Sequence, residues 1–362
     1  NRIMQKRSFI GMILIVLSIV LASFSIIFLL YYHEEKSCLT LEYESVKRMA
    51  EVEEYINLCI KEQGFEIVKE DINLTGLVGP DFTEITSTPG DEREKRSTLN
   101  PYSASAVMSM LLEIGLKKGD KIAVGASGSY PGFLLSVLSA SSTLGLDTKL
   151  ILSLGSSMYG ATRLEYNIFN IAEDAKESGL IDYDLVAVSR GYKDDRGGSA
   201  LVRILYVDTG DLSSDICKAA ALKNDCELIN LPSLQDSIER RMELWGDVSL
   251  FINVGGAPVN IGDGTYSFSV PVGLVKGVKD IPEGEGRGLV YEYLDKNVPV
   301  INLLDSRGFS EKYGVEFDAS PFPEVVKTFP NILPLLLGII FFILAAISTT
   351  VSILVLKEGK RR

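Results

Sequence analysis

Histidine is nearly missing from this sequence of 362 residues, in which His33 is the only one. The rest of the chain has no imidazole to serve as a base or as a zinc ligand. A Ser-His-Asp or Cys-His enzyme is therefore excluded for the long central part of the chain, and so is a histidine zinc site. Catalysis there would have to use other groups, such as serine with lysine or paired carboxylates.

Several familiar motifs are also missing. The four cysteines, Cys38, Cys59, Cys217 and Cys226, show no C-x-x-C spacing. Their even number permits two disulfides, and four independent thiols fit equally well. No Walker A phosphate loop occurs, and no dinucleotide fingerprint of the G-x-G-x-x-G type. We therefore predict no cofactor and no bound metal.

Positive charge is scarce as well. The chain has 36 Lys and Arg against 48 Asp and Glu, a formal net charge of −12. This balance argues against a nucleic-acid partner. A group of aspartates between residues 194 and 211 has the oxygen ligands of a hard cation but does not fit the EF-hand pattern. Solvated turns explain this group better; its members are Asp194, Asp195, Asp208 and Asp211.

What the chain does have is a long apolar run near each end, at residues 9–32 and 332–356. Each exceeds the roughly 20 residues needed to cross a bilayer. Arg2, Lys6 and Arg7 precede the first run, and Lys357, Lys360, Arg361 and Arg362 follow the second. The positive-inside rule then places both ends in the cytoplasm. The second run also contains glycine and hydroxyl residues, which suit helix–helix packing but also occur in ordinary spans.

These runs divide the chain into five parts. We expect a basic cytoplasmic tail at 1–8, a transmembrane helix at 9–32, an extracytoplasmic domain at 33–330, a second transmembrane helix at 331–356, and a second basic tail at 357–362. Within the domain, apolar residues spaced three or four apart predict a membrane-proximal helix at 33–63. The protein is therefore expected to cross a bacterial inner membrane twice.

The middle of the chain alternates between short apolar runs and segments with helical spacing. Strands are predicted at 121–124, 150–152, 185–187, 227–230, 250–254 and 298–303, with a further apolar run at 200–207. Such alternation is typical of a parallel sheet covered by helices on both faces. The predicted fold is thus an α/β, Rossmann-like, mainly parallel sheet domain between two transmembrane helices.

The segment before the first strand, residues 77–100, is polar and charged. A stretch of this kind usually forms a solvated loop. Lys95 and Arg96 lie within it. They are either exposed basic residues or the cations that hold an anionic ligand.

The best candidate for a binding element is the stretch 121–145, which reads as strand, small-residue turn and helix. Turns that follow parallel strands emerge on the same side of the sheet, where α/β proteins place ligands. We expect the turns at 125–130, 156–157 and 253–256 to meet there and bind an anion through backbone N–H groups. Arg190 or Arg307 would add charge, and Gly128→Val would block the ligand without unfolding the protein. The predicted ligand-binding residues are Lys95, Arg96, Gly125, Ser127, Gly128, Ser129, Tyr130, Ser156, Ser157, Asn253, Gly255 and Gly256.

Several segments, in order along the chain, resemble the poly-gamma-glutamate system protein family, the membrane-anchored accessory proteins of bacterial poly-γ-glutamate synthesis. The resembling segments are 95–101, 119–131, 153–160, 253–256 and 299–304, with Arg307 and 313–314. Asn302 stands where family members often carry histidine. The resemblance implies a pathway, the production or export of poly-γ-glutamate, and no particular reaction.

Two main functional hypotheses follow. In the first, the chain is a non-catalytic envelope subunit whose outer domain binds the γ-glutamyl polymer or a partner, while its spans dock against the membrane subunits of the synthase. In the second, it is an enzyme that hydrolyses or transfers γ-glutamyl chains, with Ser127 or Ser129 as nucleophile and a lysine as base. The sequence turn lacks the G-x-S-x-G pattern, because Ser129 stands where the last glycine belongs. A small-ligand sensor is a third reading that the fold allows.

Overall fold

The computed structural model describes residues 2–198, 212–262 and 270–360. The chain forms two compact units: Asn1–Thr40 with Lys327–Arg362, and Leu41–Val326. The predicted apolar run at 200–207 lies outside the described residues, as do Asp208 and Asp211.

The first unit is built from the N-terminal helix as far as Thr40 and from a second apolar helix near the C-terminus. α1 (Arg2–Glu62) contains the predicted span at 9–32 and continues without a break through the predicted helix at 33–63. α12 (Ile332–Lys360) contains the second predicted span. Both are long and apolar enough to cross a membrane, which is compatible with a two-pass membrane protein.

These two helices pack against each other through hydroxyl groups and glycines. The Ser25 hydroxyl donates to the Gly338 carbonyl at 2.8 Å, and the Ser348 hydroxyl donates to the Leu14 carbonyl at 2.9 Å. A third bond runs from the Ser352 hydroxyl to a main-chain carbonyl of α1 at 2.9 Å. Gly338, Ser348 and Ser352 of the second predicted span are thus used for helix–helix packing, whereas Thr349 and Thr350 bond to carbonyls of their own helix.

The second unit is organised around a seven-stranded sheet. All neighbouring strands are parallel except the edge strand β8, which is antiparallel to β9. In spatial order the strands are β6 (Glu227–Ile229), β5 (Asp184–Ser189), β3 (Asp147–Ser153), β2 (Lys121–Ser127), β7 (Leu250–Val254), β9 (Val300–Leu303) and β8 (Gly273–Val275). The six predicted strands within the described residues and their mainly parallel arrangement are confirmed.

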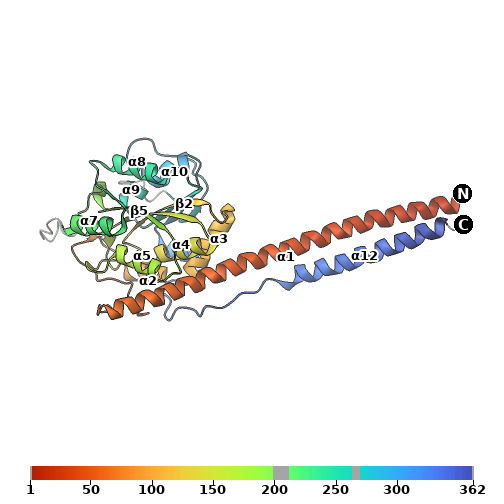
Figure 1. Ribbon diagram of the computed structural model, residues 1–362, viewed down its shortest axis with the longest axis horizontal. Helices are drawn as coiled ribbons and strands as arrows, with labels where there is room; N and C mark the ends of the chain where they lie inside the picture. The colour runs from red at the N-terminus through yellow and green to blue at the C-terminus, as the bar shows by residue number, and fades with distance from the viewer. Residues whose placement is uncertain (1, 199–211, 263–269, 361–362) are drawn as a thin grey trace. The chain divides into compact units, whose positions relative to one another are not determined.

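Helices cover both faces of this sheet (Figure 1). Side chains of a strand point alternately to the two faces, so Ile122 and Val124 of β2 join one apolar cluster and Ala123 joins the other. The larger cluster packs against the end of α1 and against α3 (Tyr102–Ile114), α4 (Pro131–Leu144), α5 (Ile168–Glu177), α7 (Leu212–Asn224) and α11 (Ser306–Tyr313). The smaller packs against α8 (Leu234–Trp245), α9 (Pro258–Ile261) and α10 (Leu289–Asp295).

The unit β2–α4–β3 shows how local sequence sets the elements. Pro131 opens α4, where a missing N–H has no cost and its fixed φ suits a helix. Gly145 ends the helix in the left-handed conformation with φ 73°, which favours glycine. Residues of α4 from Pro131 to Ser141 are buried, because the helix lies between the sheet and α3.

The segment at 77–100 differs from the predicted solvated loop. It contains β1 (Thr86–Thr88), which pairs in parallel with β4 (Ser156–Ser157), and α2 (Glu92–Thr98). Lys95 and Arg96 are buried, with 3% and 8% of their surface exposed. The sequence of residues 77–100 alone could not show this burial, because β4, the strand that pairs with β1, lies about 70 residues further along the chain. The four cysteines form no disulfide in the structure.

Candidate functional site

The strand order creates a crevice at one point of the sheet. From β2 the chain proceeds outward through β3, β5 and β6, and then returns to β7 on the other side of β2. The connections that leave β2 and β7 therefore diverge. In open α/β sheets, ligands bind at the carboxyl ends of the strands at such a switch point.

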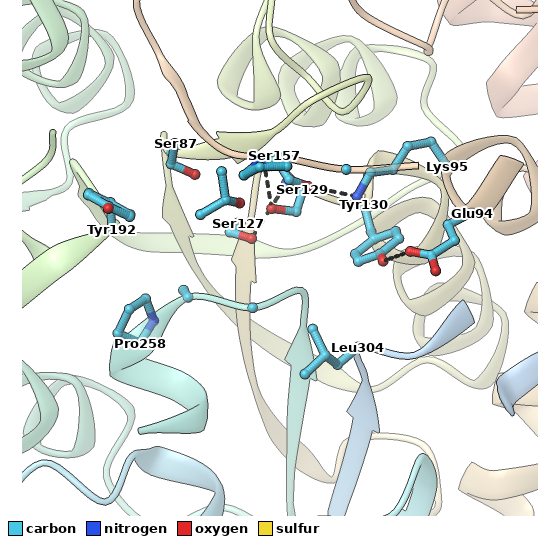
Figure 2. A pocket seen from close by; sticks show the side chains of 16 residues that line it. Ser87, Glu94, Lys95, Ser127, Ser129, Tyr130, Ser157, Tyr192, Pro258 and Leu304 are labelled. Atoms are coloured by element: carbon cyan, nitrogen blue, oxygen red, sulfur yellow. Dashed lines mark hydrogen bonds between the residues drawn. The ribbon is translucent and has the colours of Figure 1, made fainter. Parts of the chain in front are cut away.

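A pocket of about 240 Å³ lies at this point (Figure 2). The three turns predicted to meet do lie together. A Cβ built on Gly255 would stand 2.4 Å from the Ser127 hydroxyl, and the Ser157 N–H donates to the Ser129 hydroxyl at 3.1 Å. In Figure 2, the hydroxyl side chains gather on the side opposite Pro258 and Leu304.

Half of the predicted ligand-binding residues line this pocket: Lys95, Ser127, Ser129, Tyr130, Ser157 and Gly256. The other half do not line it: Arg96, Gly125, Gly128, Ser156, Asn253 and Gly255. Among these, Arg96 forms a two-pronged ion pair with Asp318, at 2.7 and 2.9 Å. Its role is to fix α2 to the C-terminal part of the domain.

The other two cations expected to contact the ligand, Arg190 and Arg307, contact protein groups instead. The Arg190 Nε donates to the Ser213 hydroxyl at 3.0 Å, and Arg307 lies 4.1 Å from the centre of the Phe317 ring. Neither lines the pocket, in which Lys95 is the basic side chain contributed by the described residues.

Asp195, from the aspartate group considered for a hard cation, has a protein partner. Its carboxylate accepts a hydrogen bond from Arg241 at 3.0 Å, and both side chains are 1% exposed. Burial raises the pKa of Asp195, while the Arg241 guanidinium and the Ser189 hydroxyl oppose this shift. The described residues contain no cluster of potential metal ligands.

Lys95 is the most unusual group in the pocket. Its ammonium Nζ donates to the Ser157 hydroxyl at 2.7 Å and lies 3.6 Å from the centre of the Tyr130 ring. It forms no ion pair with any residue in the described ranges. Burial lowers the pKa of Lys95 to about 7, against the smaller opposing effects of Glu94 and Asp91.

The surroundings of Lys95 are fixed by hydrogen bonds. The Tyr130 hydroxyl donates to the Glu94 carboxylate at 3.0 Å, and burial together with Glu94 raises the pKa of Tyr130. Tyr130 is therefore a neutral phenol. Asp91, at the N-terminus of α2, accepts from the Arg93 backbone N–H at 2.9 Å and pairs with the Arg93 guanidinium.

Ser157 is held in place through its backbone. The flanking Ser156 N–H donates to the Ile85 carbonyl at 3.3 Å, and the Met158 N–H donates to the Thr88 carbonyl at 3.0 Å. These two bonds pair β4 with β1, and the Ser157 N–H donates to the Ser129 hydroxyl in the turn after β2. Ser157 is therefore anchored both to β1 and to this turn. The Ser157 side chain is thus presented to Lys95 by a rigid frame.

Gly128 has a packing role in this frame. Its N–H donates to the Ser153 and Gly155 carbonyls at 3.2 and 3.1 Å, so it is not a donor for a ligand. A Cβ at this position would lie 2.9 Å from the Ser156 Cβ and 3.0 Å from the Leu154 carbonyl oxygen. A larger residue is therefore expected to disturb the packing of this turn, in contrast to the expectation that Gly128→Val would act on the ligand alone.

Candidate donors for a ligand are found instead in the segment that follows β7. Gly256 and Ala257 line the pocket, and their backbone N–H groups have no hydrogen-bond partner among the described residues. Unpaired N–H groups next to serine hydroxyls can bind an anionic oxygen. Pockets of this composition suit a small polar ligand.

Sequence reasoning missed several residues that line the pocket: Ser87, Glu94, Tyr192, Ala257, Pro258 and Leu304. The sequence carries a local signal for Pro258, because a proline two residues after the Gly255-Gly256 turn is typical of the start of a helix. Glu94 had another, because Asp91 followed by Glu94 is a capping pattern. Tyr192 had none.

The structure also bears on the serine–lysine pair of the enzyme hypothesis. No lysine of the described residues hydrogen-bonds to Ser127 or Ser129, while Lys95 bonds to Ser157. No protein-family model and no curated protein matches this chain.

Proposed function

We propose that this chain is a membrane-anchored accessory subunit of bacterial poly-γ-glutamate synthesis or export. Its Rossmann-like extracytoplasmic domain binds a γ-glutamyl group in the pocket at the switch point. The proposal combines the resemblance of the chain's segments with the α/β fold and the two apolar terminal helices. Both basic ends lie in the cytoplasm of the bacterial cell, and the domain faces outward.

The observation that carries the binding role is that Gly256 and Ala257, whose backbone N–H groups have no hydrogen-bond partner among the described residues, line the same pocket as several serines. These neutral donors are available at every pH. The γ-carboxylate or α-carboxylate of a glutamyl residue supplies the acceptor oxygens that such donors need. A volume of about 240 Å³ suits one such residue at a time, so the pocket binds a chain end or a single residue of the polymer.

The two spans are the part that docks with the membrane subunits of the synthase. Their hydroxyl and glycine contacts join α1 to α12. Docking therefore uses the larger apolar side chains that both helices expose, such as Phe9 and Phe342.

The binding role is tested at Ala257. Its φ of −64° is the value that proline requires, so Ala257→Pro removes one N–H donor with little change of backbone shape. Ala257→Ser retains the donor and is the matched control. Binding of a γ-linked glutamate dimer to the full chain in detergent is measured by calorimetry, and polymer output is measured in cells.

We expect Ala257→Pro to weaken binding at least about tenfold, because one hydrogen bond to a charged group contributes ~1.5–3 kcal/mol. Ala257→Ser should stay within about threefold of the parent. The fluorescence of Trp245, which is buried in the domain, checks that each variant is folded. Unchanged affinity and polymer output in a folded Ala257→Pro variant would contradict the proposed function.

A further inference from the structure

We propose that Ser157 and Lys95 form a nucleophile and general base for acyl transfer in this pocket, acting on an amide or ester of a carboxylic acid. The inference goes beyond a binding role, and it rests on the proposed function only for the identity of the acyl group. Under that function, the substrate is a γ-glutamyl amide.

The first argument is geometric. A nucleophile and its base must lie within hydrogen-bond reach, and Lys95 Nζ lies 2.7 Å from Ser157 Oγ. Among the described residues, the Ser157 hydroxyl has no acceptor for its own proton. Its proton is therefore free to move to a neutral Lys95 amine.

The second argument concerns the environment of the lysine. A permanent cation for anion binding is usually arginine, whereas a buried lysine loses its charge readily and is found as a general base. Lys95 is 3% exposed and has no carboxylate partner among the described residues. The direction of its pKa shift agrees, since burial brings the pKa to about 7, near the pH at which a base works best.

The third argument is preorganisation. Ser157 is fixed through the pairing of β4 with β1 and through the bond from its N–H to Ser129. Lys95 is fixed by its place on α2, which Arg96 ties to Asp318. Both groups are held by backbone structure from three separate parts of the chain, as a catalytic pair requires.

The reaction is balanced as follows. Ser157 Oγ bonds to the carbonyl carbon of the acyl donor while its proton passes to the neutral Lys95 amine. The carbonyl electron pair moves to oxygen, and the Gly256 and Ala257 N–H groups are the donors available for this oxyanion. On collapse, the C–N bond breaks and the leaving amine takes the proton from Lys95. Water then cleaves the Ser157 ester in the same manner and releases a carboxylic acid.

This scheme also explains why one pocket serves both roles. The carboxylate that the proposed function places at Gly256 and Ala257 is the product of cleaving the corresponding amide. Product carboxylate and tetrahedral oxyanion place a negatively charged oxygen at the same donors.

The test uses the full chain in detergent and a fluorophosphonate probe, in which serine Oγ bonds to phosphorus and fluoride leaves. A small ester, p-nitrophenyl acetate, is the second probe. We expect the fluorophosphonate to label the peptide that contains Ser157. The labelling rate should rise with pH through about 7 as Lys95 loses its proton. The titratable groups around Lys95 are Tyr130, Glu94 and Asp91, and the first two are joined to each other.

Ser157→Ala should abolish labelling, and Lys95→Arg should slow it by about 100-fold or more, within the range for removal of a general base. Lys149→Arg is the matched control, because Lys149 is paired with Asp147 and Asp184 away from the pocket. It should label at the rate of the parent. Trp245 fluorescence again reports folding.

Three results would overturn the inference: no reaction with either probe between pH 6 and 9, a label on Ser127 or Ser129, or an unchanged rate in Lys95→Arg. Each leaves the proposed function standing if Ala257→Pro still weakens binding. Conversely, labelling of Ser157 in the parent protein would support acyl transfer. If affinity and polymer output were at the same time unchanged in Ala257→Pro, the proposed function would be rejected.

Discussion

Asn253 and Asn302 are joined across the neighbouring strands β7 and β9 by a hydrogen bond of 2.8 Å from Asn253 Nδ2 to Asn302 Oδ1. The Asn260 side chain donates to Asn253 Oδ1 at 3.0 Å and to the Gly125 carbonyl at 2.9 Å. Asn253 and Gly125, predicted as ligand contacts, are thus parts of a buried amide chain that joins β2, β7, β9 and α9, and neither lines the pocket. Asn302, which stands where the resembling family often has histidine, stabilises the sheet here.

Replacing Asn253 by alanine should destabilise the domain by about 1–3 kcal/mol, because both neighbouring amides lose a buried partner. Urea unfolding of the full chain in detergent, followed by Trp245 fluorescence, measures the change. Asn224→Ala is the control: its side chain bonds to a carbonyl on its own helix at an exposed site, so its effect should stay below about 0.5 kcal/mol. Equal effects of the two substitutions would contradict a structural role for the amide chain.

The charge state of Lys95 predicts how stability depends on pH. The folded pKa of about 7 is lower than the ordinary lysine value of 10.5. Between these values the unfolded chain binds more protons, so the free energy of unfolding rises with pH. Relative to Lys95→Met, the parent should gain about 2 kcal/mol of stability between pH 7 and pH 9. Urea unfolding of both proteins at the two pH values gives the difference, and a difference that is independent of pH would show that Lys95 is not buried as described.

Substitution of Gly128 should lower the stability of the domain and have no separate effect on ligand binding. Gly128→Ala should cost about 1–3 kcal/mol, because its Cβ meets the Ser156 side chain and a carbonyl oxygen in a packed turn. Gly277→Ala is the control, because a Cβ there meets nothing within 4 Å. The midpoint of urea unfolding measures both. A fully stable Gly128→Ala variant would show that the turn after β2 is looser than this packing implies.

The orientation of the chain is a further prediction. Protease added to spheroplasts should cut within the domain at 41–326 and spare tags at both termini, because the basic flanks favour the cytoplasm. Lysed spheroplasts are the control in which the tags are also cut. Loss of either tag from intact spheroplasts would reverse the proposed topology.

Sequence reasoning recovered the features that depend on local pattern. Apolar runs such as 250–254 became parallel strands, and the turns after β2 and β7 met because turns after parallel strands share one side of a sheet. Switch-point geometry then placed Ser127, Ser129 and Gly256 around one pocket. These results follow from periodicity and from general rules of α/β topology.

The remaining features depend on contacts between distant segments. The burial of Lys95 results from the pairing of β1 with β4 and from the ion pair between Arg96 and Asp318. Polar composition at 77–100 suggests the opposite. The partner of Lys95 could not be chosen from the sequence either, because many serines follow the strands and only the folded chain shows which hydroxyl reaches the amine.

The hydroxyl bonds between α1 and α12 fix the register of the two apolar helices. Each residue of a helix turns by about 100°, so one residue inserted between Leu14 and Ser25 would rotate the Ser25 contact away and leave the two contacts at Leu14 and Gly11 in place. After an insertion of four residues, Ser25 would point nearly toward α12 again, but it would be shifted by about 6 Å along the helix axis. The two helices are therefore matched in sequence, and replacing either with a generic apolar helix would keep its length and hydrophobicity but lose these contacts.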